Sequence, residues 1–355
     1  MQAPDSAAEL IWDGTDAPVL VARRGAVQHI RLNRPKALNS LTLEMITIIA
    51  AALDVAEQDA AVGLVVIDGA GERGFCAGGD IRSVSESGRA GDGIAQAFWR
   101  AEYAVNARIA AFPKPYVAFM DGITMGGGVG LSAHGSHRIV TERTRLAMPE
   151  TGIGFIPDVG GTWLLARAPG ETGTYMGLTG NSVGAADAVF AGFADSVVPS
   201  ARCPALRLAL LALPSSAEAG DVDAVIAEFS EPAGQSLLSE QQTLIDRAMR
   251  ADDPSGIVDS LKVDGSAFAQ ETADTILARS PTSVKVTLAL LRLARQSPSL
   301  EACLAREYAA ACETLRGHDF YEGVRAAVID KDRHPRWSPA TLSDVDAAVV
   351  AAHLH

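Results

Sequence analysis

Residues 64–68 read Leu64-Val65-Val66-Ile67-Asp68, an apolar run that ends directly before a glycine-rich turn. A short continuous run of this kind is typical of a strand buried on both faces of a parallel sheet. Tyr116–Met120 is a second such run, and strand-like and helix-like segments alternate as far as about Val198. The sequence therefore predicts an α/β fold in which right-handed β-α-β crossovers surround a mostly parallel sheet.

The segments around these two runs complete the predicted order of elements. The patterns predict a hairpin, three helices and two short strands: Leu20–Ala22 with Val27–Leu32, Leu43–Gln58 (capped by Asn39, Ser40 or Thr42), Ile94–Ala111, a helix opening within Gly126–Ser132, Arg138–Val140 and Arg145–Ala147. From Ser200 to His355 the chain is rich in Ala and Leu with helical periodicity. We therefore divide the chain into a core of residues 18–200 and a mainly helical region of residues 201–355.

Composition and charge exclude several classes of protein. Hydrophobic residues make up 48% of the 355 residues, which provides a large core and excludes disorder of the whole chain. A net charge of −13 argues against nucleic acid or an anionic membrane surface as the main partner. No apolar run reaches the about 18 residues of a membrane span. Asp5, Glu9 and Asp13 precede any Lys or Arg, and the four cysteines form no CxxC pair, so we expect a cytoplasmic protein with reduced thiols.

Gly69, Gly71 and Gly74 match the GxGxxG pattern of a dinucleotide-binding turn. In that motif a helix begins among the glycines, but here the chain continues through Phe75-Cys76-Ala77-Gly78-Gly79-Asp80. No clear strand with an acidic end follows about 20 residues later. We interpret these glycines as a turn and expect no nicotinamide cofactor.

Two further glycine clusters, Ala77-Gly78-Gly79-Asp80 and Met125-Gly126-Gly127-Gly128, each follow a predicted buried strand. Neighbouring parallel strands bring their carboxyl ends to one edge of a sheet, where small ligands bind. Glycine allows a main-chain N–H group to approach a ligand closely, and two such groups facing one point form an oxyanion hole. The alternative, that both clusters are only tight turns, stays open at this point.

Two carboxylates, Glu150 and Asp158, lie eight residues apart in a mostly apolar, turn-forming segment. A carboxylate in apolar surroundings has a raised pKa and can act as an acid, a base or a nucleophile. The alternative is that both acids cap helices, with Asp158 capping a helix that starts near Gly160.

Other candidate sites are weaker. The segment Gly130-Leu131-Ser132-Ala133-His134 lacks the final glycine of the GxSxG motif of a nucleophile elbow. His134 and His137 have no metal-ligand partners at a useful spacing. We expect these side chains to be structural and the site to hold no metal.

Longer motifs surround these glycines and carboxylates: Leu32–Ser40, Gly74–Arg82, Lys114–Gly135, Met148–Gly161, Ser280–Ser283, Asp319–Ala326 and Ile329–Asp332. In these motifs the sequence resembles the crotonase (enoyl-CoA hydratase/isomerase) superfamily, and the last three are similar to the 3-hydroxyisobutyryl-CoA hydrolases within it. The likeness runs from about residue 18 to about residue 340. It implies a spiral of β-β-α units with a helical C-terminal region, commonly assembled as a homo-oligomer, a trimer or a hexamer.

The resemblance also implies roles for individual residues. Gly79 and Gly127 would donate the oxyanion-hole hydrogen bonds to a thioester carbonyl, and Glu150 falls where the family keeps its catalytic glutamate. Asp158 stands where the hydrolases have an aspartate and typical hydratases have glycine, and Glu102 matches a substrate-contacting glutamate of the hydrolases. The coenzyme A groove would be lined by Ala37, Leu38, Ala77 and Ile81. Coenzyme A is part of an acyl-CoA substrate, so no separate cofactor is expected.

One departure separates the activities within the family. Hydratases need two glutamates, and the position of the second is Gly130 here. Without that acid, addition of water to a C=C bond loses half of its acid–base pair. We therefore expect hydrolysis of a short, branched 3-hydroxyacyl-CoA, as in valine breakdown. A hydratase or isomerase that uses Glu150 is the alternative, and a non-catalytic coenzyme A-binding protein is a third hypothesis, against which the retained carboxylates count.

Overall fold

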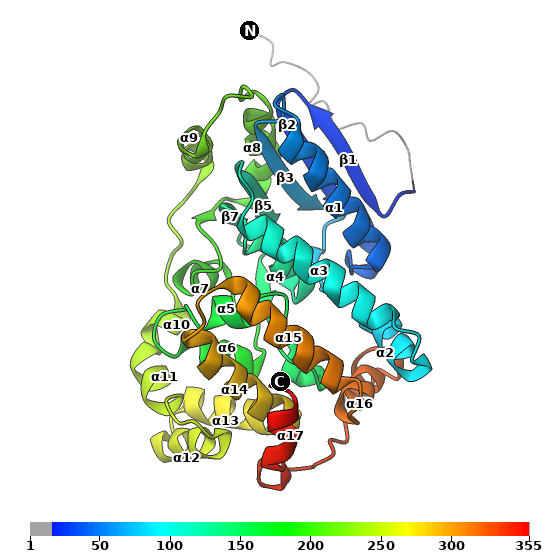
Figure 1. Cartoon of the computed structure of the whole chain (residues 1–355). Helices are drawn as coiled ribbons and strands as arrows, with labels where there is room; N and C mark the ends of the chain where they lie inside the picture. Colours follow the sequence, from blue (N-terminus) through cyan, green and yellow to red (C-terminus); the bar gives the residue numbers. More distant parts are fainter. Residues whose placement is uncertain (1–15, 355) are drawn as a thin grey trace.

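The computed structural model describes residues 16–354, and its larger sheet has six strands in the order β1-β2-β3-β5-β7-β9 (Figure 1). Their bounds are β1 (Val19–Arg24), β2 (Val27–Leu32), β3 (Leu64–Gly69), β5 (Tyr116–Met120), β7 (His137–Val140) and β9 (Ser196–Val197). β1 and β2 pair antiparallel as a hairpin, and every later pair of neighbours is parallel. The predicted hairpin and the mostly parallel sheet are confirmed.

Both faces of this sheet are covered, which explains the unbroken apolar run along β3. Val65 and Ile67 pack into the cluster that contains the buried side chains of α1 (Leu43–Gln58) and α3 (Ile94–Ala110). Leu64 and Val66 point to the other face and pack with side chains of α8 (Cys203–Leu211) and α9 (Ala219–Phe229). Because neighbouring side chains on a strand point to opposite faces, a strand covered on both sides is apolar throughout.

A second sheet has three short parallel strands in the order β4-β6-β8. Its strands are β4 (Gly74–Cys76), β6 (Ile123–Met125) and β8 (Arg145–Ala147). Each one follows a strand of the larger sheet, so the pairs β3-β4, β5-β6 and β7-β8 repeat along the chain. This repeat is the spiral that the resemblance implies. Of these three-residue strands only β8 was predicted, whereas β4 and β6 overlap the glycine-rich segments that were interpreted as turns.

The helices before residue 200 position the segments that follow the short strands. The predicted helix Leu43–Gln58 is confirmed, and Thr42 caps it by accepting a hydrogen bond from the Met45 amide. The other helices of this part are α2 (Ile81–Ala90), α4 (Gly127–Ser132), α5 (Gly161–Leu165), α6 (Thr172–Thr179) and α7 (Ala185–Phe190). No helix begins among Gly69, Gly71 and Gly74, which confirms that these glycines form a turn between two strands.

After residue 200 the described chain is helical. Besides α8 and α9 it contains α10 (Leu237–Glu240), α11 (Gln242–Ala248), α12 (Pro254–Asp264), α13 (Ala267–Ala278), α14 (Pro281–Arg295), α15 (Leu300–Thr314), α16 (Asp319–Val324) and α17 (Ala347–Ala352). Figure 1 shows α11–α14, α16 and α17 gathered at the end of the molecule away from β1 and β2. The largest apolar cluster nevertheless contains residues from β1 to Leu342, and the domain boundary near residue 200 stays a prediction.

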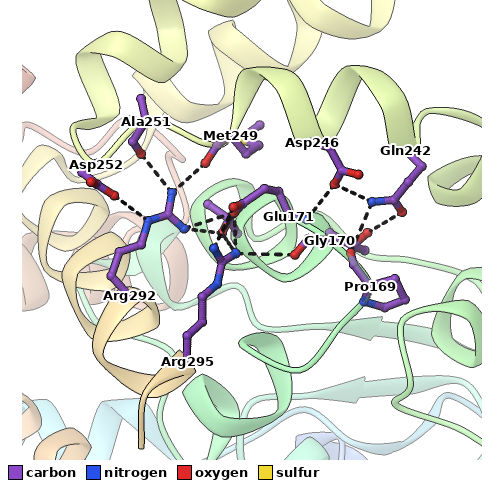
Figure 2. A network of polar contacts seen from close by, with 12 residues as sticks. Pro169, Gly170, Glu171, Gln242, Asp246, Met249, Ala251, Asp252, Arg292 and Arg295 are labelled. Carbon is purple, nitrogen blue, oxygen red and sulfur yellow. Dashed lines mark hydrogen bonds and ion pairs between the residues drawn. The ribbon is translucent and has the colours of Figure 1, made fainter.

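A buried ion-pair network joins these C-terminal helices to the start of α6 (Figure 2). Glu171 accepts hydrogen bonds from Arg295 at 2.5 and 2.7 Å and from Arg292 at 3.1 Å, both on α14. The Glu171 amide donates to Asp246 of α11 at 2.8 Å. Glu171 is 8% exposed, so its charge is compensated by arginines rather than by water.

No helix among residues 16–354 is long and apolar enough to cross a membrane.

Candidate active site

The chain segments that leave β4, β6 and β8 meet at one cavity of about 310 Å³. Gly79 follows β4, Gly127 follows β6 and Glu150 follows β8, and all three line this cavity. The sequence pattern places the glycine clusters after the buried strands Leu64–Asp68 and Tyr116–Met120. That assignment was wrong by one strand, since the short second sheet brings them together. The principle held, because the carboxyl ends of parallel strands share an edge.

Gly79 and Gly127 face each other closely. A Cβ atom built on Gly127 would lie 3.4 Å from the Gly79 amide nitrogen and 2.4 Å from Oε1 of Glu102. Gly127 is the first residue of α4, so its N–H group has no partner within the helix. Within residues 16–354 neither amide donates a hydrogen bond to another main-chain or side-chain group. Two free donors at one end of the cavity form a geometry that suits a developing oxyanion.

Gly127→Ala should lower kcat by at least about tenfold while the chain stays folded, because loss of one oxyanion donor costs 10²–10³. The added methyl group would overlap Glu102 Oε1 and would lie 2.9 Å from Leu41 Cδ1, so it would displace the amide. Gly220→Ala is the matched control, since a Cβ there meets no atom within 4 Å. Steady-state kinetics and circular dichroism check the pair; a folded Gly127→Ala variant with unchanged kcat would remove this amide from the mechanism.

Three carboxyl groups border the same cavity: Glu102 on α3, Glu150 at the start of a 3-10 turn (Glu150–Ile153), and Asp158 just before α5. Burial, together with the charge of Asp158, raises the pKa of Glu150 and of Glu102 well above the usual range. Burial also raises the pKa of Asp158 to about 7, against the lowering effect of a hydrogen bond from Tyr103. Oε2 of Glu150 and Oε1 of Glu102 have no hydrogen-bond partner among the described residues.

These environments contradict the helix-capping alternative for both acids. Asp158 Oδ2 accepts a hydrogen bond from the Tyr103 hydroxyl at 2.7 Å, not from an amide of α5. The cap of α5 is supplied instead by Glu307 of α15, which accepts from the Gly160 amide at 2.7 Å and the Thr162 amide at 2.9 Å. The sequence analysis missed Tyr103 and Glu307. No local pattern marks either side chain, because both act across long stretches of chain.

Asp158→Asn should stabilise the unliganded protein at alkaline pH. A carboxyl group whose folded pKa is raised from 3.8 to about 7 stabilises the fold at low pH and loses that contribution as the pH rises through 7. Asparagine has no such titration and can still accept from Tyr103. The gain in melting temperature over wild type should therefore be larger at pH 8 than at pH 5, by at least about 2 °C.

Calorimetry at the two pH values measures this gain, with the exposed Asp274→Asn as the control. An equal gain at both pH values would contradict a raised pKa at Asp158.

The predicted coenzyme A contacts fall into two groups. Ala77 and Ile81 line the cavity, whereas Ala37 and Leu38 do not. Ala37 is exposed on a neighbouring 3-10 turn (Pro35–Ala37), and the Leu38 carbonyl accepts a hydrogen bond from the Ala77 amide at 3.0 Å. Ala37 and Leu38 therefore lie next to the cavity, with Leu38 bonded to the lining residue Ala77, but they are not part of its lining.

Aromatic side chains close the apolar part of the cavity, and the sequence analysis did not single them out. Trp99 of α3 stacks on Phe155 with ring centroids 5.4 Å apart, and Phe155 contacts Phe320 of α16 at 5.5 Å. Phe98, Ile153 and Val328 complete this wall. Phe98 and Trp99 precede Glu102 by four and three residues, so both lie next to it on the face of α3 that lines the cavity.

The side chains expected to be structural are so. His134 Nε2 contacts the Val159 carbonyl at 2.8 Å, and His137 Nε2 contacts the Ala219 carbonyl at 3.3 Å. The Ser132 hydroxyl donates to the Gly128 carbonyl within α4 at 2.7 Å. Among residues 16–354 no group of three His, Cys, Asp or Glu side chains could hold a metal ion.

Comparison with known proteins places the chain in one family. Residues 27–354 match the family described as enoyl-CoA hydratase/isomerase. The chain belongs to the enoyl-CoA hydratase/isomerase family. Curated members of the family that are similar to it are named "3-hydroxyisobutyryl-CoA hydrolase, mitochondrial". The zebrafish (Danio rerio) protein is 44% identical over 94% of this chain and 88% of its own length, and the human protein is 43% identical over 93% and 87%.

Two solved structures of family members superpose over nearly the whole chain. One is described as a carnitinyl-CoA dehydratase from Mycobacterium thermoresistibile, with a TM-score of 0.90, 45% identity, and coverage of 95% of this chain and 96% of the other. The second is described as an enoyl-CoA hydratase from Rhodobacter sphaeroides 2.4.1, with a TM-score of 0.88, 44% identity, and coverage of 95% and 97%. The predicted crotonase-like fold is confirmed, while the names of similar proteins divide between hydrolase and hydratase.

Proposed function

We propose that this member of the enoyl-CoA hydratase/isomerase family hydrolyses the thioester of a short, branched 3-hydroxyacyl-CoA, of the 3-hydroxyisobutyryl-CoA type. The observation that carries the proposal is that Glu150 and Asp158 line one cavity, while Gly130 stands where the resemblance puts the second glutamate of a hydratase. The curated hydrolases, at 43–44% identity over more than nine tenths of this chain, support the same activity. The small aromatic-walled cavity suits a short acyl group rather than a long chain.

The proposed mechanism begins with the two free amides. The N–H groups of Gly79 and Gly127 hold the thioester oxygen and stabilise the negative charge that develops on it. Glu150 then attacks the carbonyl carbon to form a mixed anhydride that water hydrolyses, or it removes a proton from the attacking water. In both routes the C–S bond breaks, the thiolate of coenzyme A takes up a proton, and water supplies the hydroxyl of the free acid.

The remaining carboxyl groups suit orientation of the substrate. Asp158, fixed by Tyr103, would hold the 3-hydroxyl group or the water, and Glu102 lies against Gly127 at the oxyanion end. A carboxyl group kept protonated by burial donates a hydrogen bond, whereas an ionised one accepts. Burial raises the pKa of all three carboxyl groups, which favours the protonated, donating form more than it would be favoured in water.

A hydratase or isomerase activity is the second candidate, and the descriptions of the two solved relatives favour it. An isomerase needs one base, so Glu150 alone would serve. Incubation with 3-hydroxyisobutyryl-CoA and with crotonyl-CoA separates the two: release of thiol indicates hydrolysis, and loss of the enoyl absorbance indicates hydration. Coenzyme A binding without turnover of either ester would support the non-catalytic hypothesis.

Assembly and location complete the proposal. We propose an acyl-CoA substrate with no separate cofactor, and a homotrimer or hexamer, which light scattering of the purified protein would test. A cytoplasmic location also stays a proposal, because the curated relatives carry the word mitochondrial in their names. The acidic N-terminal residues on which it depends lie outside the described part of the chain. Cell fractionation would decide it.

A further inference from the structure

The backbone turn that carries Asp158 is strained. Val159 has a φ of +55° and Gly160 a φ of +77°, so two consecutive residues adopt left-handed conformations. Glycine does so freely, but a β-branched valine does so only with backbone strain. Such a conformation persists only where its surroundings hold it, and strain of this kind concentrates at functional sites.

Three side chains from three different elements hold this turn. Tyr103 of α3 donates to Asp158 Oδ2 at 2.7 Å, and His134, just after α4, contacts the Val159 carbonyl at 2.8 Å. Glu307 of α15 is fully buried and accepts from the Gly160 amide at 2.7 Å. Its other carboxylate oxygen accepts from both the amide and the hydroxyl of Thr162. The turn therefore has an anchor before, within and after its strained residues.

We propose that Glu307 is a positioning residue for catalysis: by gripping Gly160 and Thr162 it keeps the strained turn closed and Asp158 directed into the cavity. The inference rests on the proposed function, because it assumes that Asp158 works on the substrate. Glu307 does not line the cavity, so it would act on the reaction only through the turn that it holds. In this way a C-terminal helix, α15, would contribute to catalysis. An ordinary helix cap would not require a strained residue directly before it.

Charge gives the proposal a readout beyond stability. The ionisable groups that face Asp158 are Glu102 and Tyr103 from α3, Glu150 from the 3-10 turn, and Glu307 from α15. The Tyr103 hydrogen bond lowers the pKa of Asp158, whereas the ionised form of Glu307, whose own pKa burial raises to about 7, raises it. His134 adds no charge near neutral pH, because burial lowers its pKa to about 4.

The test compares Glu307→Gln with Glu171→Gln. Glutamine at 307 keeps one acceptor oxygen but turns an NH₂ group toward the amides of the turn. We expect kcat to fall about tenfold or more with KM changed less than about threefold, since small misplacements in an active site have effects of this size. Glu171 is also a buried glutamate tied to the C-terminal helices, yet it lies outside the cavity lining. Its variant should lower the melting temperature and leave kcat unchanged.

The pH profile of kcat gives the second measurement. Glu307→Gln should shift the limb that reports Asp158 to lower pH, and Tyr103→Phe should shift it to higher pH. Opposite shifts follow from the opposite effects of these two groups on the pKa of Asp158. A Glu307→Gln variant that melts earlier but keeps wild-type kcat and an unmoved limb would overturn the proposal and leave Glu307 a simple helix cap.

Val159→Gly supplies a rescue. Glycine adopts a φ of +55° without strain, so the turn of Glu307→Gln/Val159→Gly needs less support from position 307. The kcat of this double variant should lie above that of Glu307→Gln alone, and absence of any recovery would count against a strained turn as the cause.

All variants are assayed with whichever CoA ester the wild type turns over. Failure of the hydrolase proposal would then be visible in the wild type alone, while the comparison among variants still decides the role of Glu307.

Discussion

Glu150→Gln should abolish turnover of 3-hydroxyisobutyryl-CoA while binding of the CoA ester stays largely intact. Glutamine keeps the shape of the side chain and removes its charge and its basicity. General acid–base participation contributes about 10²–10⁴-fold, and loss of a nucleophile costs at least as much, so kcat should fall by that order or more. Activity above about a tenth of wild type would show that Glu150 is not the main catalytic group.

The structure explains why binding should survive this change. Glu150 Oε2 has no hydrogen-bond partner within the described residues, so a glutamine side chain at this position breaks no hydrogen bond of that atom. Oε1 of Glu150 lies near Gly126 at the edge of the cavity. A buried carboxyl group with a raised pKa also disfavours the folded state as the pH rises through that pKa. The variant should therefore fold at least as well as wild type. Calorimetric titration with the ester and a melting curve check both points, and a variant that neither folds nor binds would leave the kinetics without meaning.

Asp158→Asn should lower kcat as well, though less than Glu150→Gln. Asparagine retains the acceptor for Tyr103 and so keeps the turn in place, but it loses the charge that would hold a water or a 3-hydroxyl group. A kcat below that of Glu150→Gln would instead assign the leading role to Asp158.

The long elements could be predicted because each one carries many residues of pattern. The apolar runs of β3 and β5 follow from the helices that cover both faces of the larger sheet, and α1 was predicted from its apolar face and three candidate caps, of which the structure uses Thr42. β4 and β6 were missed, and they turn the glycine clusters toward each other. Of the three-residue strands the sequence pattern indicated only β8; β4 and β6 lie in glycine-rich segments and are fixed by pairing with distant partners.

The site was predictable to the same degree. Glu150 and Asp158 stood out because acids are rare in apolar, turn-forming segments. Gly79 and Gly127 stood out because each lies in a glycine cluster that follows a predicted strand. Tyr103 and Glu307 did not stand out, because each sits in a helix where polar residues usually face water. Their roles depend on contacts with Asp158 and Gly160, and only the folded chain brings these groups together.

Hydration of crotonyl-CoA should be slow in the wild-type protein. The resemblance to hydratases puts their second glutamate at Gly130, and this chain offers no room for one. A Cβ atom on Gly130 would lie 2.7 Å from Val159 Cβ and 2.8 Å from Asn106 Nδ2, both buried. Gly130→Glu should therefore disturb the core around Val159 and lower the melting temperature rather than supply a working acid.

The decisive measurement is kcat/KM for crotonyl-CoA hydration beside kcat/KM for 3-hydroxyisobutyryl-CoA hydrolysis in one preparation. Absence of one acid–base group should slow hydration about 10²–10⁴-fold relative to a two-glutamate hydratase, while hydrolysis keeps Glu150, Asp158 and both oxyanion amides. Glu150→Gln, purified in parallel, is the control, since activity from a contaminating enzyme would survive in it. Efficient hydration that disappears in Glu150→Gln, with no release of thiol, would overturn the hydrolase proposal. It would also show that Glu150 is required for hydration, and it would leave Glu102 or Asp158 of the same cavity to supply the second acid–base group.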